Sequence, residues 1–236
     1  MRQKLISVLV GGMLSLAALP GLGSPAPRAA VKFSRIDVGA AQADGVSPDV
    51  LRLALNAVTC ATTHGDIPAP RTLTLIDYSR PSVEPRLWVY DLSSGEMLFK
   101  ELVAHGRDTG ENLATHFSDR MNSHQSSLGM FVTGDTYVGS NGYSLRLDGL
   151  EPGFNARARE RAIVMHGAAY VSEAFAEARG RLGRSWGCPA LREAVARKVI
   201  DLVKGGSLLF AYYPDQQWLK SSTYLGDCAA AATAAP

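Results

Sequence analysis

Apolar residues repeat at helical spacing near the beginning and near the end of the chain. The first repeat, in residues 51–58, follows Ser47-Pro48, which provides an N-cap and a proline at the first helical position. We therefore predict a helix over residues 48–61. Two more helices are predicted, at Ser172–Arg179 before Gly180 and from about residue 191 to 204 before Gly205-Gly206. The apolar face of the last helix would include Leu191, Val195, Val199 and Leu202.

Between these helices the pattern favours β-strands. Short apolar or alternating runs occur at residues 73–76, 86–90, 97–99, 129–138, 143–147, 162–165 and 207–213. Residues 91–96 contain Ser93-Ser94-Gly95 and predict a hairpin turn. Residues 105–127 are polar, contain three histidines and predict a long loop, which in a compact domain is often functional. The pattern as a whole predicts a mainly β domain with a few helices.

The first 23 residues have the pattern of a secretory signal peptide. Arg2 and Lys4 precede an apolar run over residues 5–19, and Gly21-Leu22-Gly23 offers small residues for cleavage. The run is short for a membrane span of roughly 20 residues, and an uncleaved anchor is the alternative. We expect a signal peptide over 1–23, a flexible spacer over 24–45 and a single domain over 46–236 that ends in a short Ala-rich tail.

The net charge and the predicted export argue against nucleic acid and membranes as partners. The formal net charge of +2 falls to zero once Arg2 and Lys4 leave with the signal segment. A neutral protein has no electrostatic reason to bind nucleic acid or an anionic membrane. We expect the mature chain in the periplasm or cell wall, without stable membrane association after cleavage.

The three cysteines are an odd number for an oxidising compartment, where thiols tend to pair. Cys60 lies in the first predicted helix and Cys228 lies in the tail, whereas Cys188 stands between Gly187 and Pro189. The simplest arrangement is a disulfide between Cys60 and Cys228 and a free thiol at Cys188. Sequence alone does not establish pairing, so this arrangement is a hypothesis.

Cys188 and His166 are the candidates for catalytic chemistry. His166 directly follows the apolar run 162–165, and Cys188 lies between a glycine and a proline that suit a turn better than a core. An imidazole that takes the thiol proton would create a nucleophile for acyl transfer, and backbone N–H groups of the turn could hold an oxyanion. From these residues alone a structural cysteine is the more common alternative, and the order His before Cys reverses that of papain-like proteases.

His166-Gly167 followed by Ser185-Trp186-Gly187-Cys188 resembles the catalytic motif of L,D-transpeptidases, which has His, a spacer, Ser or Thr, any residue, Gly and Cys. Further stretches resemble the murein L,D-transpeptidase catalytic-domain family, a second branch related to the YkuD type. They are residues 76–79, 126–129, 142–147 and 183–190. The resemblance spans about residues 72–213 and so covers most of the expected domain.

The resemblance implies a YkuD-like β-sandwich catalytic fold that needs no cofactor. Cys188 would attack the carbonyl of the third residue of a peptidoglycan stem tetrapeptide, D-Ala would leave, and an amine of a neighbouring stem would complete a 3→3 cross-link. His166 would be the general base and acid, and the Gly167 carbonyl would orient its imidazole. The N–H groups of Gly187 and Cys188 would hold the oxyanion, and Ser185 would support the loop.

Departures from the motif bear on substrate binding. Trp186 stands where the broader family usually has His, and it is either a wall of the substrate cleft or a packing anchor. Pro189-Ala190 replaces an apolar residue followed by Arg or Asn, so Arg184 or Arg146 is a candidate for the substrate carboxylate. Tyr143 lies in a family-like stretch that would border the cleft.

Other polar residues have simpler interpretations. The spacing of His105, His116 and His124 resembles no compact zinc site, so no metal is predicted. The cluster Arg157–Arg161 is most simply a solvated turn. Two alternative functions use the same fold: an L,D-carboxypeptidase, in which water is the acceptor, and a wall-binding module without turnover.

Overall fold

Residues 35–226 and 228, which a computed structural model describes, form five helices and nine strands. The helices are α1 (Val38–Ala43), α2 (Pro48–His64), α3 (Glu173–Arg179), α4 (Glu193–Val203) and α5 (Gln216–Ser221). The strands are β1 (Thr72–Asp77), β2 (Leu87–Asp91), β3 (Met97–Glu101), β4 (Val103–Ala104), β5 (Gly129–Gly139), β6 (Gly142–Gly149), β7 (Val164–Gly167), β8 (Ala190–Leu191) and β9 (Leu208–Tyr212). The predicted mainly β fold with a few helices is confirmed.

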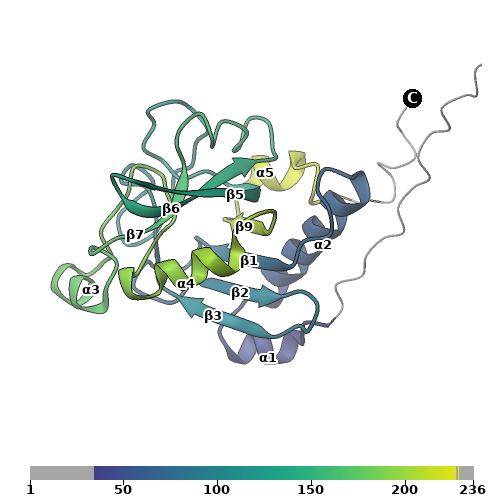
Figure 1. Ribbon diagram of the computed structural model, residues 1–236, viewed down its shortest axis with the longest axis horizontal. Coiled ribbons are helices and arrows are strands. Elements are labelled where there is room, and N and C mark those ends of the chain that lie inside the picture. Colours follow the sequence, from purple (N-terminus) through teal and green to yellow (C-terminus); the bar gives the residue numbers. More distant parts are fainter. Residues whose placement is uncertain (1–34, 227, 229–236) are drawn as a thin grey trace, which may run out of the picture.

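The strands belong to one sheet in the order β3-β2-β1-β9-β5-β6-β7-β8-β4. The pairs β1–β9 and β7–β8 are parallel, and the other neighbouring pairs are antiparallel. The strands at the two ends of this order, β3 and β4, are separated in sequence only by Leu102. The sheet therefore curls until its two edges nearly meet (Figure 1). The apolar core includes residues of its strands and of the helices α2, α4 and α5.

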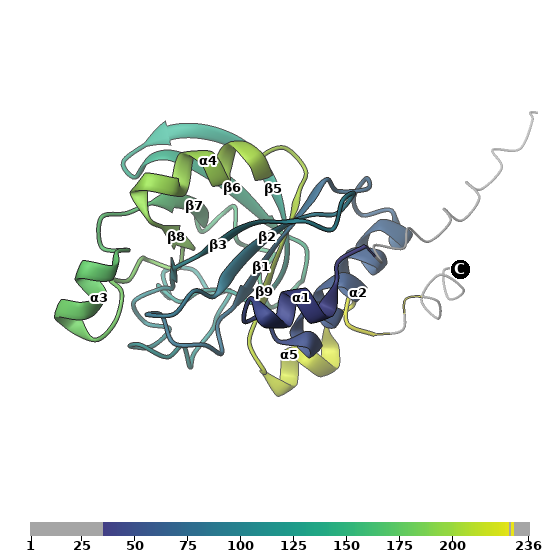
Figure 2. The same cartoon turned by 90° about the horizontal axis from the view of Figure 1, so that it is seen from below.

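The helices cover this core from two sides. α4 packs on β7 and also contacts β1 and β6, whereas α2 contacts β1 and β9. Figures 1 and 2 show α1, α2 and α5 gathered at one end of the molecule and α3 at the other. None of the described helices is both long enough and apolar enough to cross a bilayer.

The helix α4 differs from the helix predicted over residues 191–204 in its first residue and in the residues that it buries. Leu191 belongs to β8, where it pairs with Gly167 and Val103, so α4 begins two residues later. Val195 is half-buried. The buried residues of the helix are Ala196, Val199, Ile200 and Val203. The predicted face was therefore correct for Val199 and in part for Leu202, which packs half-buried against the core, but Leu191 lies in a strand outside the helix.

The N-terminal part of the chain contains more helix than predicted, both before and after the predicted helix at residues 48–61. Ser47 caps α2 as predicted, and the helix continues to His64 because Gly65, in the left-handed conformation, ends it. Residues 38–43 of the expected spacer form α1, and Ile36 and Ala41 are buried in the core. The spacer therefore ends earlier than expected. Residues 24–34 and the predicted signal segment lie outside the described residues.

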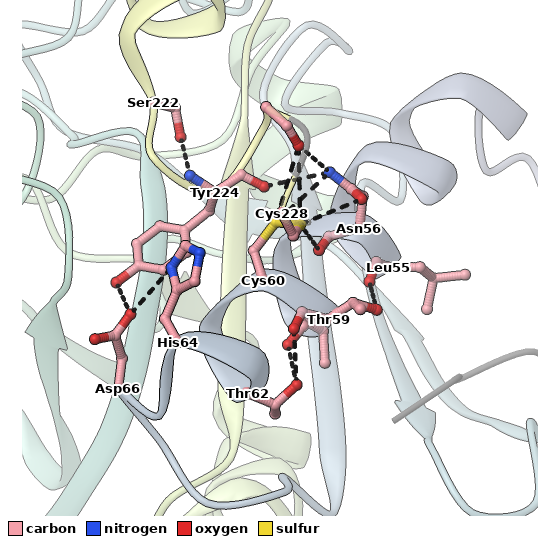
Figure 3. The surroundings of a disulfide bond; sticks show 12 residues. Leu55, Asn56, Thr59, Cys60, Thr62, His64, Asp66, Ser222, Tyr224 and Cys228 are labelled. Carbon is pink, nitrogen blue, oxygen red and sulfur yellow. Dashed lines mark hydrogen bonds and ion pairs between the residues drawn. A yellow bond between two sulfur atoms is a disulfide. The ribbon is translucent and has the colours of Figure 1, made fainter. Parts of the chain in front are cut away.

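The chain after β9 returns to α2. Cys60 of α2 forms a disulfide with Cys228, which confirms the proposed pairing (Figure 3). Around it, Asn56 Nδ2 donates to Gly226 O at 3.2 Å, and Tyr224 Oη donates to Asp66 at 2.8 Å. Covalent and polar contacts therefore tie the end of the described chain to α2. Residues 229–236 of the predicted Ala-rich tail lie outside the described residues.

α5 was not predicted from the sequence. Asp215 caps it by accepting from the Trp218 N–H at 2.8 Å. Trp218 is buried against Phe210, and its indole N–H donates to Glu151 at 2.9 Å. The helix is too short to show a repeat of apolar residues, so its burial depends on contacts from distant parts of the chain.

Candidate active site

The free cysteine lies in a turn between the strand β7 and the start of β8. We call residues 184–188, which end in the candidate nucleophile Cys188, the nucleophile turn. Cys188 is unpaired and 7% exposed, and its Sγ accepts from the Val164 N–H at 3.4 Å. The same sulfur lies 3.7 Å from Ala162 O, to which the thiol can donate. The sulfur is thus held against the backbone that leads into β7.

His166 lies within β7 rather than directly after a strand. β7 runs from Val164 to Gly167, because Ala162, with φ of 54°, turns the chain before it. His166 pairs with Ser144 on β6 and with Ala190 on β8. Val164, which contacts the sulfur, is two residues before His166, a step of about 7 Å along a strand. The parallel pair β7–β8 therefore places Cys188, two residues before β8, beside the strand that carries His166.

The imidazole of His166 has a fixed orientation. Its Nδ1 lies 2.9 Å from Gly167 O, the contact that was expected for this carbonyl. A carbonyl oxygen can only accept, so Nδ1 carries the hydrogen and Nε2 keeps a lone pair. Gly167 itself faces α4, where an ideal Cβ would lie 3.0 Å from Ala196 Cβ. His166, its neighbour on the strand, therefore points to the opposite face.

Ser185 closes the nucleophile turn. Its Oγ donates to Cys188 O at 2.7 Å and accepts from the Gly187 N–H at 3.1 Å. Ser185 thus connects the middle of the turn to its last residue. The Gly187 N–H, however, is engaged within the turn and is not free for an oxyanion, contrary to the expectation. Among the hydrogen bonds of the described residues, the Cys188 N–H has no acceptor and remains available.

Gly187 is required by both backbone conformation and space. Its φ is 114°, in the region that favours glycine. A Cβ at this position would lie 2.7 Å from Gln125 O and 2.9 Å from Ile163 Cδ1. The predicted long loop, residues 105–127, therefore packs directly against the turn. Ser126 Oγ joins the two by donating to Gly187 O at 3.1 Å.

Trp186 is an exposed part of the turn. Its side chain is 70% exposed, and its ring centroid is 5.3 Å from that of His124 in the long loop. Of the two interpretations, a buried packing anchor is wrong. An exposed indole two residues before the cysteine can instead contact a bound substrate.

Arg184 and Tyr143, both predicted to bind substrate, are engaged elsewhere. Arg184 Nη1 donates to Glu111 at 2.7 Å and to the carbonyls of Arg107 and Gly110 at 3.0 Å, which secures the long loop. Tyr143 Oη donates to Asp201 of α4 at 2.6 Å. Since the adjacent residue on β6, Ser144, pairs with His166, Tyr143 points to the other face of the sheet. The geometry supports neither residue as a substrate ligand.

Burial shifts the pKa values of the two reactive groups in opposite directions. It raises the pKa of the Cys188 thiol, although the Val164 N–H and the Arg161 guanidinium oppose this shift. It lowers the pKa of His166, and the Gly167 carbonyl opposes that shift. Both groups are therefore uncharged near neutral pH. An uncharged imidazole can accept the proton of an uncharged thiol, which generates the nucleophile at the moment of attack.

The L,D-transpeptidase catalytic domain family matches residues 42–212, which is more than half of the chain. The chain belongs to this family. Among curated proteins, none matches it at a significant level.

Several solved L,D-transpeptidases are similar at low identity. One from Mycobacterium smegmatis is 14% identical with a TM-score of 0.40, over 61% of this chain and 59% of that one. L,D-transpeptidase 1 from Mycobacterium tuberculosis is 13% identical with a TM-score of 0.35, over 61% and 62%. One from Stackebrandtia nassauensis is 15% identical with a TM-score of 0.38, over 70% and 68%. The chain thus spans about 60% of the length of the first two.

Within this L,D-transpeptidase domain, one residue near the thiol was misjudged from the sequence. Arg161, assigned to a solvated turn, has a side chain that is only 3% exposed. Its neighbour Arg159, by contrast, is half exposed and pairs with Asp148. No local signal separates these arginines, because the sequence places both in the same polar turn. Only the fold shows which one points inward.

The three histidines of the long loop have separate surroundings. His105 is buried, and its Nδ1 accepts from Arg86 Nη2 at 2.8 Å. Burial, followed by the charge of Arg86, lowers the pKa of His105 to about 3, so it is neutral. His116 contacts Thr115, and His124 lies against Trp186. Within residues 35–226 and 228, no group of three His, Cys, Asp or Glu could hold a metal ion.

Proposed function

We propose that this protein is a peptidoglycan L,D-transpeptidase that forms 3→3 cross-links through a Cys188 thioester. Membership of the family supports the reaction class. The observation that carries the proposal is the pairing of β7 with β8, which sets a free thiol beside a strand whose histidine has an oriented imidazole. Thioester chemistry requires these two groups and no cofactor.

In the first half of the reaction, His166 Nε2 takes the Cys188 proton as Sγ attacks the carbonyl carbon of the third stem residue. The oxyanion accepts from the Cys188 N–H, since the Gly187 N–H is held by Ser185. As the intermediate collapses, the C–N bond to D-Ala breaks and His166 returns its proton to the leaving amine. A thioester and free D-Ala result.

In the second half, the amine of a neighbouring stem attacks the thioester carbonyl. His166 takes a proton from this amine, the C–S bond breaks and the proton passes to the sulfur. The product is an amide between two third residues. Trp186, exposed beside the cysteine, supports one stem at the entrance. The proposed substrate lies in the cell wall, so we also propose export by the N-terminal signal segment.

The proposal is tested by incubating the mature protein with disaccharide tetrapeptide and separating the products by mass spectrometry. Cross-linked dimers and free D-Ala are expected from the wild type, and neither from Cys188→Ala. A Cys60→Ala/Cys228→Ala variant is the matched control, because it removes the other two cysteines and leaves the proposed nucleophile in place.

Other outcomes identify the alternatives. Tripeptide without dimers would mean that water is the acceptor and that the protein is an L,D-carboxypeptidase. A wall-binding module would give no product and no adduct with a carbapenem such as imipenem, which a solved L,D-transpeptidase holds in complex. A covalent adduct on the wild type that is absent from folded Cys188→Ala is expected if Cys188 is the nucleophile.

A further inference from the structure

A buried arginine lies on the segment that leads into β7. Arg161 Nη1 donates to Ser118 O at 2.7 Å and to Ser127 Oγ at 2.5 Å. Its Nη2 donates to Gln125 O at 2.6 Å and to Ser123 Oγ at 3.1 Å. One guanidinium thus binds four oxygens of the long loop, a geometry that its planar fork allows and a lysine ammonium does not.

The bound part of the loop includes its contact with the nucleophile turn. Gln125 and Ser127, both bound by Arg161, flank Ser126. Ser126 is buried, and its Oγ accepts from the Gly106 N–H at 3.0 Å and donates to Gly187 O at 3.1 Å. Fixing both neighbours of Ser126 therefore fixes the carbonyl of the peptide bond that carries the Cys188 N–H.

The same guanidinium places a positive charge near the sulfur. An ideal Cβ on Gly187 would lie 3.4 Å from Arg161 Nη2, and Cys188 Sγ is 3.7 Å from the carbonyl of the next residue, Ala162. The four oxygens that Arg161 binds belong to uncharged groups. Asp119 approaches Nη1 only to 3.8 Å and accepts from the Arg157 N–H. The positive charge is therefore incompletely neutralised.

We propose that Arg161 is a positioning residue of the acyl transfer, which holds the nucleophile turn in place through Ser126 and favours the thiolate of Cys188. This inference rests on the proposed function. The other titratable groups around Cys188 are His166 on β7, Tyr78 after β1 and Tyr170 after β7. The pKa of each tyrosine is raised to about 12, chiefly by burial, so neither titrates below pH 10.

The test compares Arg161→Gln, Arg161→Lys and Arg159→Gln in the full mature chain. Alkylation of Cys188 by iodoacetamide is followed by mass spectrometry from pH 7 to 11, because burial raises the pKa of this thiol above its usual value, and D-Ala release is measured in parallel. Loss of the charge in Arg161→Gln is expected to move the midpoint of alkylation upward by about one pH unit, since a neighbouring arginine lowers a thiol pKa. Altered access to the thiol would instead change the rate equally at every pH.

Arg161→Lys keeps the positive charge but removes the planar guanidinium, so it separates the two effects. We expect its alkylation midpoint to stay within about 0.3 units of the wild type, whereas kcat for D-Ala release falls about tenfold because the loop is no longer held. Arg159→Gln, two residues away and exposed, should match the wild type in both measurements.

An unchanged midpoint in Arg161→Gln, or an unchanged kcat in Arg161→Lys, would overturn the inference. If Arg161→Gln does not fold, the kcat of Arg161→Lys still decides the positioning role. Failure of the proposed function would look different from failure of this inference. The wild type would then release no D-Ala, but the midpoint of Cys188 alkylation would still shift when Arg161 is replaced.

Discussion

The end of the molecule that holds the disulfide and the end that holds the nucleophile turn are stabilised by different interactions. At the disulfide end, α1, α2 and α5 pack apolar residues together and the bond from Cys60 to Cys228 ties the chain (Figures 1 and 3). At the nucleophile end, the long loop and the turn are joined largely by hydrogen bonds from buried polar groups, among them Ser126, Ser185 and Arg161.

The difference shows how one domain can separate stability from reactivity. Apolar packing and a disulfide stabilise a fold without orienting any polar group. A nucleophile needs oriented N–H groups, an oriented imidazole and a free thiol, so its surroundings must be polar and every buried polar group there must find a partner. The three cysteines divide accordingly, with two in the bond and one in the turn.

The largest expected effect is a loss of activity, without a large loss of stability, on substitution of His166 at the nucleophile end. His166→Gln removes the base but keeps a group of similar size, and D-Ala release is expected to fall about 10²–10⁴-fold. The change in the free energy of unfolding should stay within about 2 kcal/mol. Steady-state kinetics and urea denaturation measure the two quantities. A large loss of stability in His166→Gln would show that the nucleophile end also contributes strongly to the stability of the fold.

The same kinetics give the pH dependence. Burial lowers the folded-state pKa of His166, so the imidazole stays neutral below its usual value of 6.5 and is protonated only at lower pH. The acidic limb of kcat/KM for the wild type, which reports the free enzyme, should therefore have a midpoint below pH 6.5. A limb centred above 6.5 would contradict the assignment of His166 as a buried base.

Removing the disulfide should affect stability and spare the chemistry. The bond joins residues 168 positions apart, and its loss in Cys60→Ala/Cys228→Ala is expected to cost roughly 3–5 kcal/mol. At 25 °C the protein that remains folded should react at Cys188 as fast as the wild type. Urea denaturation measures the stability of the variant and the wild type, and alkylation kinetics measure the reactivity of Cys188 in both. The same two measurements on reduced and oxidised wild type provide a second comparison. Slower alkylation of the folded variant would mean that the two ends are coupled.

His105 should make the nucleophile end sensitive to acid. Its folded pKa of about 3 lies below the unfolded value of 6.5, so the unfolded chain binds the proton first as the pH falls. The contribution is fully present above pH 6.5 and is lost progressively as the pH falls through 3, by about 5 kcal/mol in all at 1.4 kcal/mol per unit. Urea denaturation between pH 7 and 4 should show a shallower loss for His105→Gln. Parallel curves for the two proteins would contradict this prediction.

The smallest effect is expected for Trp186→Ala. The indole is 70% exposed, so the free energy of unfolding should change by less than about 0.5 kcal/mol. If the ring supports a bound stem, KM for the tetrapeptide should rise several-fold, by roughly 1 kcal/mol of binding, with little change in kcat. Steady-state kinetics with His124→Ala as a companion would show whether the paired rings act together. An unchanged KM would exclude the indole from the substrate site.

The accuracy of the sequence-based predictions follows the length of each element and the strength of its signals. α2 and α3 were predicted because Ser47, Ser172, Gly65 and Gly180 mark their ends. The two-residue strands β4 and β8 were missed, since two residues cannot show a period. Leu191 was consequently assigned to a helix, although its backbone pairs with β7.

The sequence by itself determined the chemical candidates, because a thiol between Gly187 and Pro189 and a histidine after an apolar run are local facts. The tertiary structure alone decided which polar residues surround them. Arg161 and Arg159 are alike in sequence, yet the side chain of Arg161 is buried and that of Arg159 is half exposed. Tyr143 and Ser144 are adjacent but lie on opposite faces of β6. Adjacent residues of any strand point to opposite faces, but which face meets the site depends on the partner strand, here the pairing of Ser144 with His166. For the two arginines, burial depends on contacts with the long loop, which lies far away in the sequence.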